Sequence, residues 1–160
     1  MALNDDLEFR QRMGVVPIAL MLGADPEDTF ALKRTYSKAR SILSDLPFVE
    51  RIEEAWFGGG LGEIVAVFLF RFQFENDSHY GWLVCGDIPW LFAPTIDSRS
   101  SKAILELYLD RVREWNRNGG TEPEYCFIGT YHPDLTDELE RRLQFIEDQI
   151  LPLMPKPTHV

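Results

Sequence analysis

Residues 63–75 read Glu-Ile-Val-Ala-Val-Phe-Leu-Phe-Arg-Phe-Gln-Phe-Glu, and this stretch decides the class of fold. Its large apolar side chains recur at every second position, the period that places residues of a β-strand on one face of a sheet. The face expected in the core carries Ile64, Ala66, Phe68, Phe70, Phe72 and Phe74. The other face is apolar up to Leu69 and polar from Arg71 onward. We therefore predict a strand that is covered on both faces at one end only.

Further strands are predicted on both sides of this stretch. Residues 48–57 alternate weakly, and the glycine-rich run at 58–62 is typical of a flexible connection, because glycine tolerates most backbone conformations. Turn-forming residues at 76–79 lead into a strand over residues 80–85, which predicts an antiparallel hairpin. Residues 90–94 are expected to form a short edge strand.

Helices are predicted before and after these strands. Asp25 and Pro26 open a helix that runs to Ser44, since aspartate caps free amides and proline suits a first turn. A second helix follows Ser100 or Ser101 and stops at Asn118-Gly-Gly. A third helix begins near Pro133 and is expected to bury Leu135, Leu139, Leu143, Ile146 and Ile150 along one stripe. Residues 1–23 are ambiguous, although Met13–Leu22 is apolar enough to dock as a strand or a short helix.

The predicted fold is a single α+β domain over residues 1–160. Its antiparallel sheet has three to four strands with helices packed on it, in the order α-β-β-β-(β)-α-α. A chain of 160 residues buries enough surface to fold without metals or disulfides. Cys85 and Cys126 are accordingly expected to be packed thiols.

The charge balance disfavours whole classes of partner. The chain has 16 Lys and Arg against 26 Asp and Glu, a formal net charge of −10, which repels nucleic acid and anionic lipid. Residues 45–98 alone hold nine acids and two bases. The acidic N-terminus does not read as a secretory signal, so a cytoplasmic location and no membrane association are expected.

Motifs for catalysis, cofactors and metals are missing from the sequence. The glycine run at 58–62 lies between strands and lacks the Lys and Ser/Thr of a phosphate loop. His79, His132 and His159 have no second ligand at the spacing that metal sites use. We therefore predict no catalytic residue, no cofactor and no metal.

The candidate binding residues form two groups. Glu50, Glu53 and Glu54 are acids on a predicted strand, where Glu53 and Glu54 should point to opposite faces and act as a charged sheet edge. The second group is Asp87, Trp90 and Phe92. The uninterrupted run Trp90-Leu-Phe92 marks a contact site if it is exposed, because aromatic anchors dominate interface energies.

The run Trp82-Leu-Val-Cys-Gly-Asp-Ile-Pro89 carries a resemblance. It is similar to a strand reading Trp-x-Val-x-Gly-Asp-(Ile/Leu)-Pro that a group of small uncharacterised bacterial proteins share. The resemblance covers about residues 64–150. It implies a fold type and a bacterial source, and no reaction or catalytic residue comes with it.

Three functions remain open from the sequence. The leading one is a non-enzymatic binding protein, such as a bacterial immunity or antitoxin-like protein that neutralises a basic protein partner, since opposite charge speeds association. The second is a small adaptor or ligand-binding module with an aromatic pocket lined by Trp56, Trp82 and phenylalanines. The third is an enzyme that uses Asp87 and a second carboxylate. The sequence does not indicate whether the protein is a monomer or an oligomer.

Overall fold

The structure is a computed structural model that describes residues 3–94, 100–122 and 126–155. Its elements in chain order are α1 (Leu3–Met13), β1 (Val16–Pro17), α2 (Pro26–Ser44), β2 (Arg51–Leu61), β3 (Val65–Phe74), β4 (Asp77–Gly86), β5 (Ile88–Pro94), α3 (Ser101–Arg117), β6 (Phe127–Ile128) and α4 (Thr136–Phe145). A π-helical turn (Ile146–Ile150) and a 3₁₀ turn (Leu151–Leu153) extend α4. The strands form one antiparallel sheet in the order β1 to β6.

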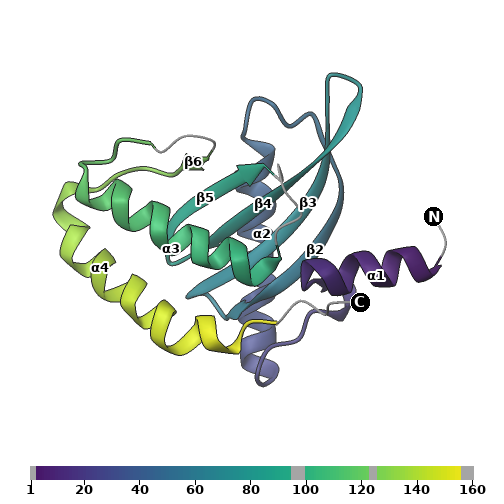
Figure 1. Ribbon diagram of the computed structural model, residues 1–160, viewed down its shortest axis with the longest axis horizontal. Coiled ribbons are helices and arrows are strands. Elements are labelled where there is room, and N and C mark those ends of the chain that lie inside the picture. The colour runs from purple at the N-terminus through teal and green to yellow at the C-terminus, as the bar shows by residue number, and fades with distance from the viewer. Residues whose placement is uncertain (1–2, 95–99, 123–125, 156–160) are drawn as a thin grey trace.

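Helices cover the sheet on both faces (Figure 1). On one face α2 packs over β2, β3 and β4, where Leu32 and Leu43 meet the phenylalanines of β3. On the other face α1 and α3 cover the sheet, and α4 packs beside α3. Because both faces are covered, three consecutive residues of β3, Val67, Phe68 and Leu69, are all fully buried although their side chains alternate between the faces.

The α+β class is confirmed, but the predicted number of strands is wrong. The sheet has six strands, because β1 and β6 pair with β2 and β5. Each of these two strands has only two residues, too few to show a period in the sequence. Since β6 covers Leu91 and Phe92, β5 is an inner strand there rather than the expected edge. The ambiguous N-terminal residues form α1, β1 and a 3₁₀ turn (Ile18–Leu20).

The alternation in β3 is confirmed in its middle, while Ile64 and Phe74 at its two ends are less buried than predicted, Phe74 being half-buried. Ala66, Phe68 and Phe70 are fully buried on the α2 side of the sheet, and Phe72 is nearly so. Ile64 was expected among them and is 37% exposed, because it lies in the turn that precedes β3. The series of buried side chains on this face therefore starts at Ala66, two residues later than predicted.

The glycine run at 58–62 is not a flexible connection, because Gly58, Gly59 and Gly60 are part of β2. A Cβ on Gly58 would lie 2.6 Å from the Ser101 Cβ at the start of α3, and one on Gly60 would lie 2.3 Å from the Val65 carbonyl oxygen. The glycines therefore let a helix and a neighbouring strand approach β2 closely.

The hairpin between β3 and β4 is tighter than predicted. Phe74 pairs with Asp77, so the turn consists of Glu75 and Asn76 rather than residues 76–79. Both residues have positive φ values, 51° and 67°, as a two-residue type I′ turn requires. The sequence pattern missed this because glutamate is not a usual residue at such a position.

The helix predictions are largely confirmed. Asp25 caps α2, with its Oδ1 accepting from the Asp28 amide at 2.8 Å, and Ser100 caps α3 in the same way. Leu139, Leu143, Ile146 and Ile150 form the expected stripe, whereas Leu135 is 52% exposed and lies before α4. Within the described residues, no helix combines the length and apolar character needed to cross a membrane.

Candidate functional site

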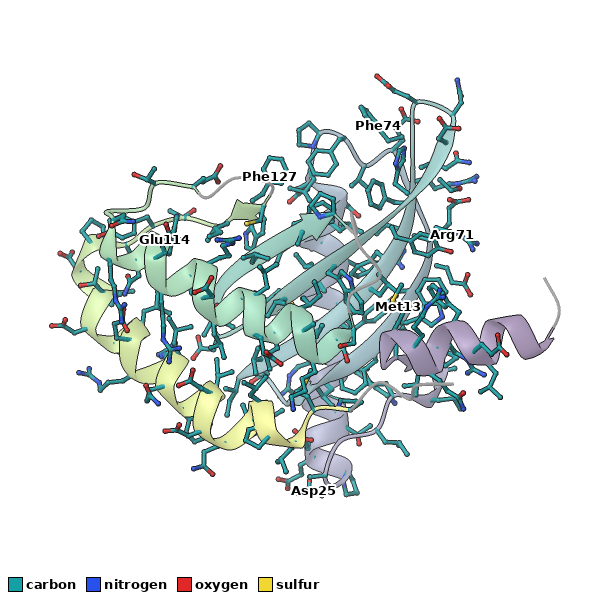
Figure 2. All side chains as sticks on the ribbon, viewed as in Figure 1. Met13, Asp25, Arg71, Phe74, Glu114 and Phe127 are labelled. Carbon is teal, nitrogen blue, oxygen red and sulfur yellow. The ribbon has the colours of Figure 1, made fainter. Side chains whose placement is uncertain are left out.

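The acids Glu50, Glu53 and Glu54 lie at the hairpin end of the sheet. A β-bulge at Glu53 breaks the alternation of β2, so the expectation that Glu53 and Glu54 point apart is wrong. Both carboxylates lie within 4 Å of the Arg71 guanidinium, at 3.9 and 3.2 Å. Figure 2 shows Arg71 on this exposed half of the sheet.

These acids also protect a sheet edge. Among the described strands only β1 pairs with the outer edge of β2, and it reaches only Trp56 and Phe57. Residues 51–55 therefore leave an edge that carries a bulge and charges. Both features discourage another strand from pairing there.

The second predicted group lies at the opposite end of the sheet. Glu54 pairs with Arg71 of β3, which in turn pairs with Tyr80 of β4. Asp87 follows Tyr80 by seven residues, so about 23 Å of strand separates the level of Glu54 from Asp87. Figure 1 shows the β3–β4 hairpin projecting at the end of the sheet away from α4. The structure therefore separates the acids Glu50, Glu53 and Glu54 from Asp87 and Trp90.

Within the second group, only Asp87 and Trp90 reach the surface. Asp87 has a side chain that is 76% exposed, and Trp90 is half-buried. Phe92 is 1% exposed and Leu91 is fully buried, because β5 is covered by helices on both faces. The run Trp90–Phe92 is therefore not the exposed aromatic patch that its sequence allowed.

Asp87 and Trp90 instead border a cavity of about 380 Å³, which we call the α4 groove. It lies between the β4–β5 turn, the segment after β6 and the start of α4. Its apolar wall consists of Ile88, Pro89, Trp90, Trp115, Leu135 and Leu139, and its polar groups include Lys38, Asp87, Asn116, His132, Glu138 and Arg142. The tryptophans predicted to line a pocket, Trp56 and Trp82, do not border this cavity, whereas Trp115 does, although it is only 2% exposed.

Small residues and buried hydrogen bonds fix the wall around Trp90. A Cβ on Gly129 would lie 2.8 Å from the Trp90 Nε1, so glycine lets the indole approach the chain after β6 closely. The Gly129 amide also donates to the Trp90 carbonyl at 2.9 Å. The Tyr108 hydroxyl of α3 donates to the Pro89 carbonyl at 2.7 Å, and burial raises the pKa of Tyr108 well above its ordinary value. The hydroxyl therefore stays a donor.

Two cations hold the β4–β5 turn from opposite layers. Lys38 Nζ of α2 donates to the Gly86 carbonyl at 2.6 Å. Arg142 Nη1 of α4 donates to the Asp87 carbonyl at 2.5 Å and lies 3.1 Å from the Asp87 carboxylate. Arg142 Nη2 donates to Glu138 at 2.9 Å. Arg142 therefore bridges the mouth of the α4 groove.

A smaller cavity of about 290 Å³ lies on the far side of this bridge. It shares Asp87, Ile88, Glu138 and Arg142 with the α4 groove. Its other walls are Ile64, Arg141 and Phe145. Two exposed apolar side chains and one more cation thus continue the groove past Arg142.

The remaining chemical candidates do not form a reactive site. Cys85 and Cys126 are buried as predicted, and burial raises the pKa of Cys85 to about 12, so its thiol stays protonated. His132 lines the α4 groove, His79 stacks on Phe72 and His159 is outside the described residues. Among the described residues, no three His, Cys, Asp or Glu side chains cluster closely enough to hold a metal ion.

Sequence reasoning found Asp87 and Trp90 but missed most of the groove. Lys38, Trp115 and Arg142 come from three different helices, and no local spacing links them to the β4–β5 turn. A local signal for the groove was present at Leu135. This leucine lies before the first turn of α4 and two residues after Pro133, so it need not belong to the buried stripe of that helix.

Comparison of the chain with models of protein families, with curated proteins and with solved structures gave no match. The resemblance at residues 82–89 to a group of bacterial proteins therefore stays a prediction.

Proposed function

We propose that this chain is a non-enzymatic binding protein that takes up an apolar or aromatic group of its ligand in the α4 groove. The observation that carries the proposal is the convergence of Trp90, Leu135 and Leu139 on one cavity of about 380 Å³ with charged groups at its mouth. Ligand sites are typically concave and apolar with a few placed polar groups. A half-buried tryptophan beside a 52% exposed leucine fits this description.

The groove is built from rigid parts. Its wall at Pro89 and Trp90 belongs to an inner strand, and Tyr108 and Gly129 fix that wall by hydrogen bonds. The opposite wall is the start of α4, which is anchored by the buried Leu139 and Leu143. A preformed site avoids the entropic cost of ordering a loop on binding. This favours the ligand-binding alternative from the sequence, with Trp90 and Trp115 in place of Trp56 and Trp82.

Phenylacetamide is a suitable neutral probe of the groove. A ligand of ten heavy atoms at about 0.4 kcal/mol per atom binds with a Kd of roughly 1 mM. Isothermal titration calorimetry should show this affinity for the parent protein. Trp90→Ala should weaken it at least about fivefold, because the variant removes the aromatic wall.

Phe30→Ala is the matched control for that titration. Phe30 is an exposed aromatic residue at the start of α2 and does not line the α4 groove. This variant should bind phenylacetamide as the parent does. Equal loss in both variants, or no binding to the parent at 10-fold the expected Kd, would show that the groove is not a binding site.

A second candidate function rests on the hairpin end of the sheet. Five acids lie there against two bases: Glu50, Glu53, Glu54, Glu75 and Asp77, with Arg51 and Arg71. This excess supports binding of a basic protein, as an immunity or antitoxin-like protein would bind its toxin. The enzyme alternative is the weaker one, because Arg142 holds one oxygen of both Asp87 and Glu138, the carboxylates of the groove.

Binding of poly-L-lysine tests the second candidate function, because two variants with the same net charge but different positions of the lost charges can be compared. Replacing Glu50, Glu53 and Glu54 by Gln should weaken binding about five- to tenfold at low salt and flatten its salt dependence. The control replaces Glu106, Asp110 and Glu114 on the exposed side of α3 by their amides, which changes the net charge equally. If the two triple variants lose the same affinity, binding follows net charge alone and the hairpin end is not a site.

A further inference from the structure

The α4 groove differs in charge from the rest of the molecule. The chain carries a net charge of −10. The groove and the smaller cavity beyond Arg142 are lined by three bases, Lys38, Arg141 and Arg142, and two acids, Asp87 and Glu138. The two cavities together thus carry three bases against two acids, in a chain that is strongly acidic as a whole.

Two of these cations converge on one turn. Lys38 and Arg142 donate to the carbonyls of adjacent residues, Gly86 and Asp87, although they come from helices on opposite faces of the sheet. Arg142 is also paired with the carboxylates of Asp87 and Glu138, whereas the Lys38 ammonium has no carboxylate partner among the ion pairs of the described residues. The mouth of the groove therefore carries two cations that can meet an anionic group of a ligand.

The resident anion at this position is the carboxylate of Asp87. It lies 3.1 Å from Arg142 Nη1 but is 76% exposed, and exposed ion pairs contribute little to stability. An incoming carboxylate can therefore replace it at small cost and gain the same charge-assisted contact. Because Arg142 already holds a carboxylate, the geometry suits another group of the same shape.

We infer that the natural ligand of the α4 groove carries a carboxylate, bound at the mouth by Lys38 and Arg142, beside an apolar or aromatic body that packs on Trp90 and Leu135. This inference rests on the proposed function and adds the chemical class of the ligand. Asp87 acts as a built-in competitor that holds Arg142 in place while the groove is empty. The aromatic wall sets affinity, and the two cations set the selectivity for charge.

Three probes of nearly equal size separate these contributions. Phenylacetate, phenylacetamide and phenethylamine share the ring and differ in charge. At low ionic strength the parent protein should bind phenylacetate about five- to tenfold more tightly than phenylacetamide, and phenethylamine most weakly. Calorimetry or ligand-observed NMR gives the three Kd values.

Three variants test the assigned roles. Arg142→Gln and Lys38→Gln should each lower the preference for phenylacetate over phenylacetamide. In Arg142→Gln the two probes should bind with about equal affinity. Asp87→Asn should raise that preference, since it removes the competing carboxylate. Arg117→Gln is the matched control, because it breaks a surface ion pair with Glu140 outside the groove, and its preference should equal that of the parent.

Each outcome decides a different claim. Equal binding of phenylacetate and phenylacetamide would overturn the carboxylate inference and leave the proposed function standing. Tightest binding of phenethylamine would show that the site selects the opposite charge. Weaker phenylacetate binding in Asp87→Asn would show that Asp87 does not compete with the ligand, and would overturn its assigned role. Absence of binding for all three probes would overturn the proposed function itself.

Discussion

Replacing Phe70 by alanine is expected to lower the free energy of unfolding by about 3–5 kcal/mol. Phe70 is fully buried between β3 and α2, where its ring stacks on Tyr36 at a centroid distance of 6.3 Å. Truncation removes this apolar area and leaves a cavity that the flanking rings cannot fill. Urea denaturation followed by circular dichroism measures the change.

The same substitution at Phe30 is the control for this experiment. Phe30 is 61% exposed, and the Arg34 guanidinium lies over its ring, 4.8 Å from the centroid. Its loss should cost less than about 1 kcal/mol. If Phe70→Ala and Phe30→Ala unfold at the same urea concentration, the packing of α2 on the sheet is wrong.

The second large effect is expected at Gly86, where alanine should cost about 2–4 kcal/mol. Gly86 has a φ of 155°, and a Cβ would lie 2.3 Å from the Ile64 carbonyl oxygen. Because the clash is with backbone, the turn before β3 or the β4–β5 turn must move. That turn carries Asp87, so the variant should also weaken phenylacetamide binding.

Gly119 separates the clash from the backbone strain. It has a φ of 70°, and a Cβ there meets no atom of the described chain within 4 Å. Gly119→Ala should therefore cost only the left-handed conformation, about 1 kcal/mol. An equal loss of stability in both variants would mean that strain alone acts at Gly86.

The predictable parts of this fold are those with many residues in one period. The ten residues of β3 and the long helices α2 and α3 follow periods of two and about 3.6, and the sequence located them closely. The sequence-based predictions are wrong at positions where a tertiary contact or a strand irregularity overrides the local sequence pattern. Gly58 is typical of a loop, yet it lies in β2, where the lack of a side chain lets Ser101 of α3 approach the strand. Glu53 breaks its alternation through a bulge that no pattern in the sequence announced.

The candidate site was predictable only where it is local. Asp87 and Trp90 stand out beside Gly86 and Pro89, and both line the groove. Phe92 looked equivalent to Trp90, but it lies two residues further into β5, where β6 and the helices bury it. Lys38 and Arg142 reach the turn over sequence separations of 48 and 55 residues, so only the folded chain brings them together.

The indole resonances of the four tryptophans test the central claim, that the α4 groove binds a ligand, most directly. Trp90 and Trp115 line the groove, whereas Trp56 and Trp82 are buried in the core away from it. In a ¹H–¹⁵N NMR titration with phenylacetamide, the Trp90 indole signal should shift most and saturate with a Kd of roughly 1 mM, while the Trp56 and Trp82 signals stay in place. A Trp90 signal that does not move, or four signals that move alike, would contradict the assignment of the α4 groove as the binding site.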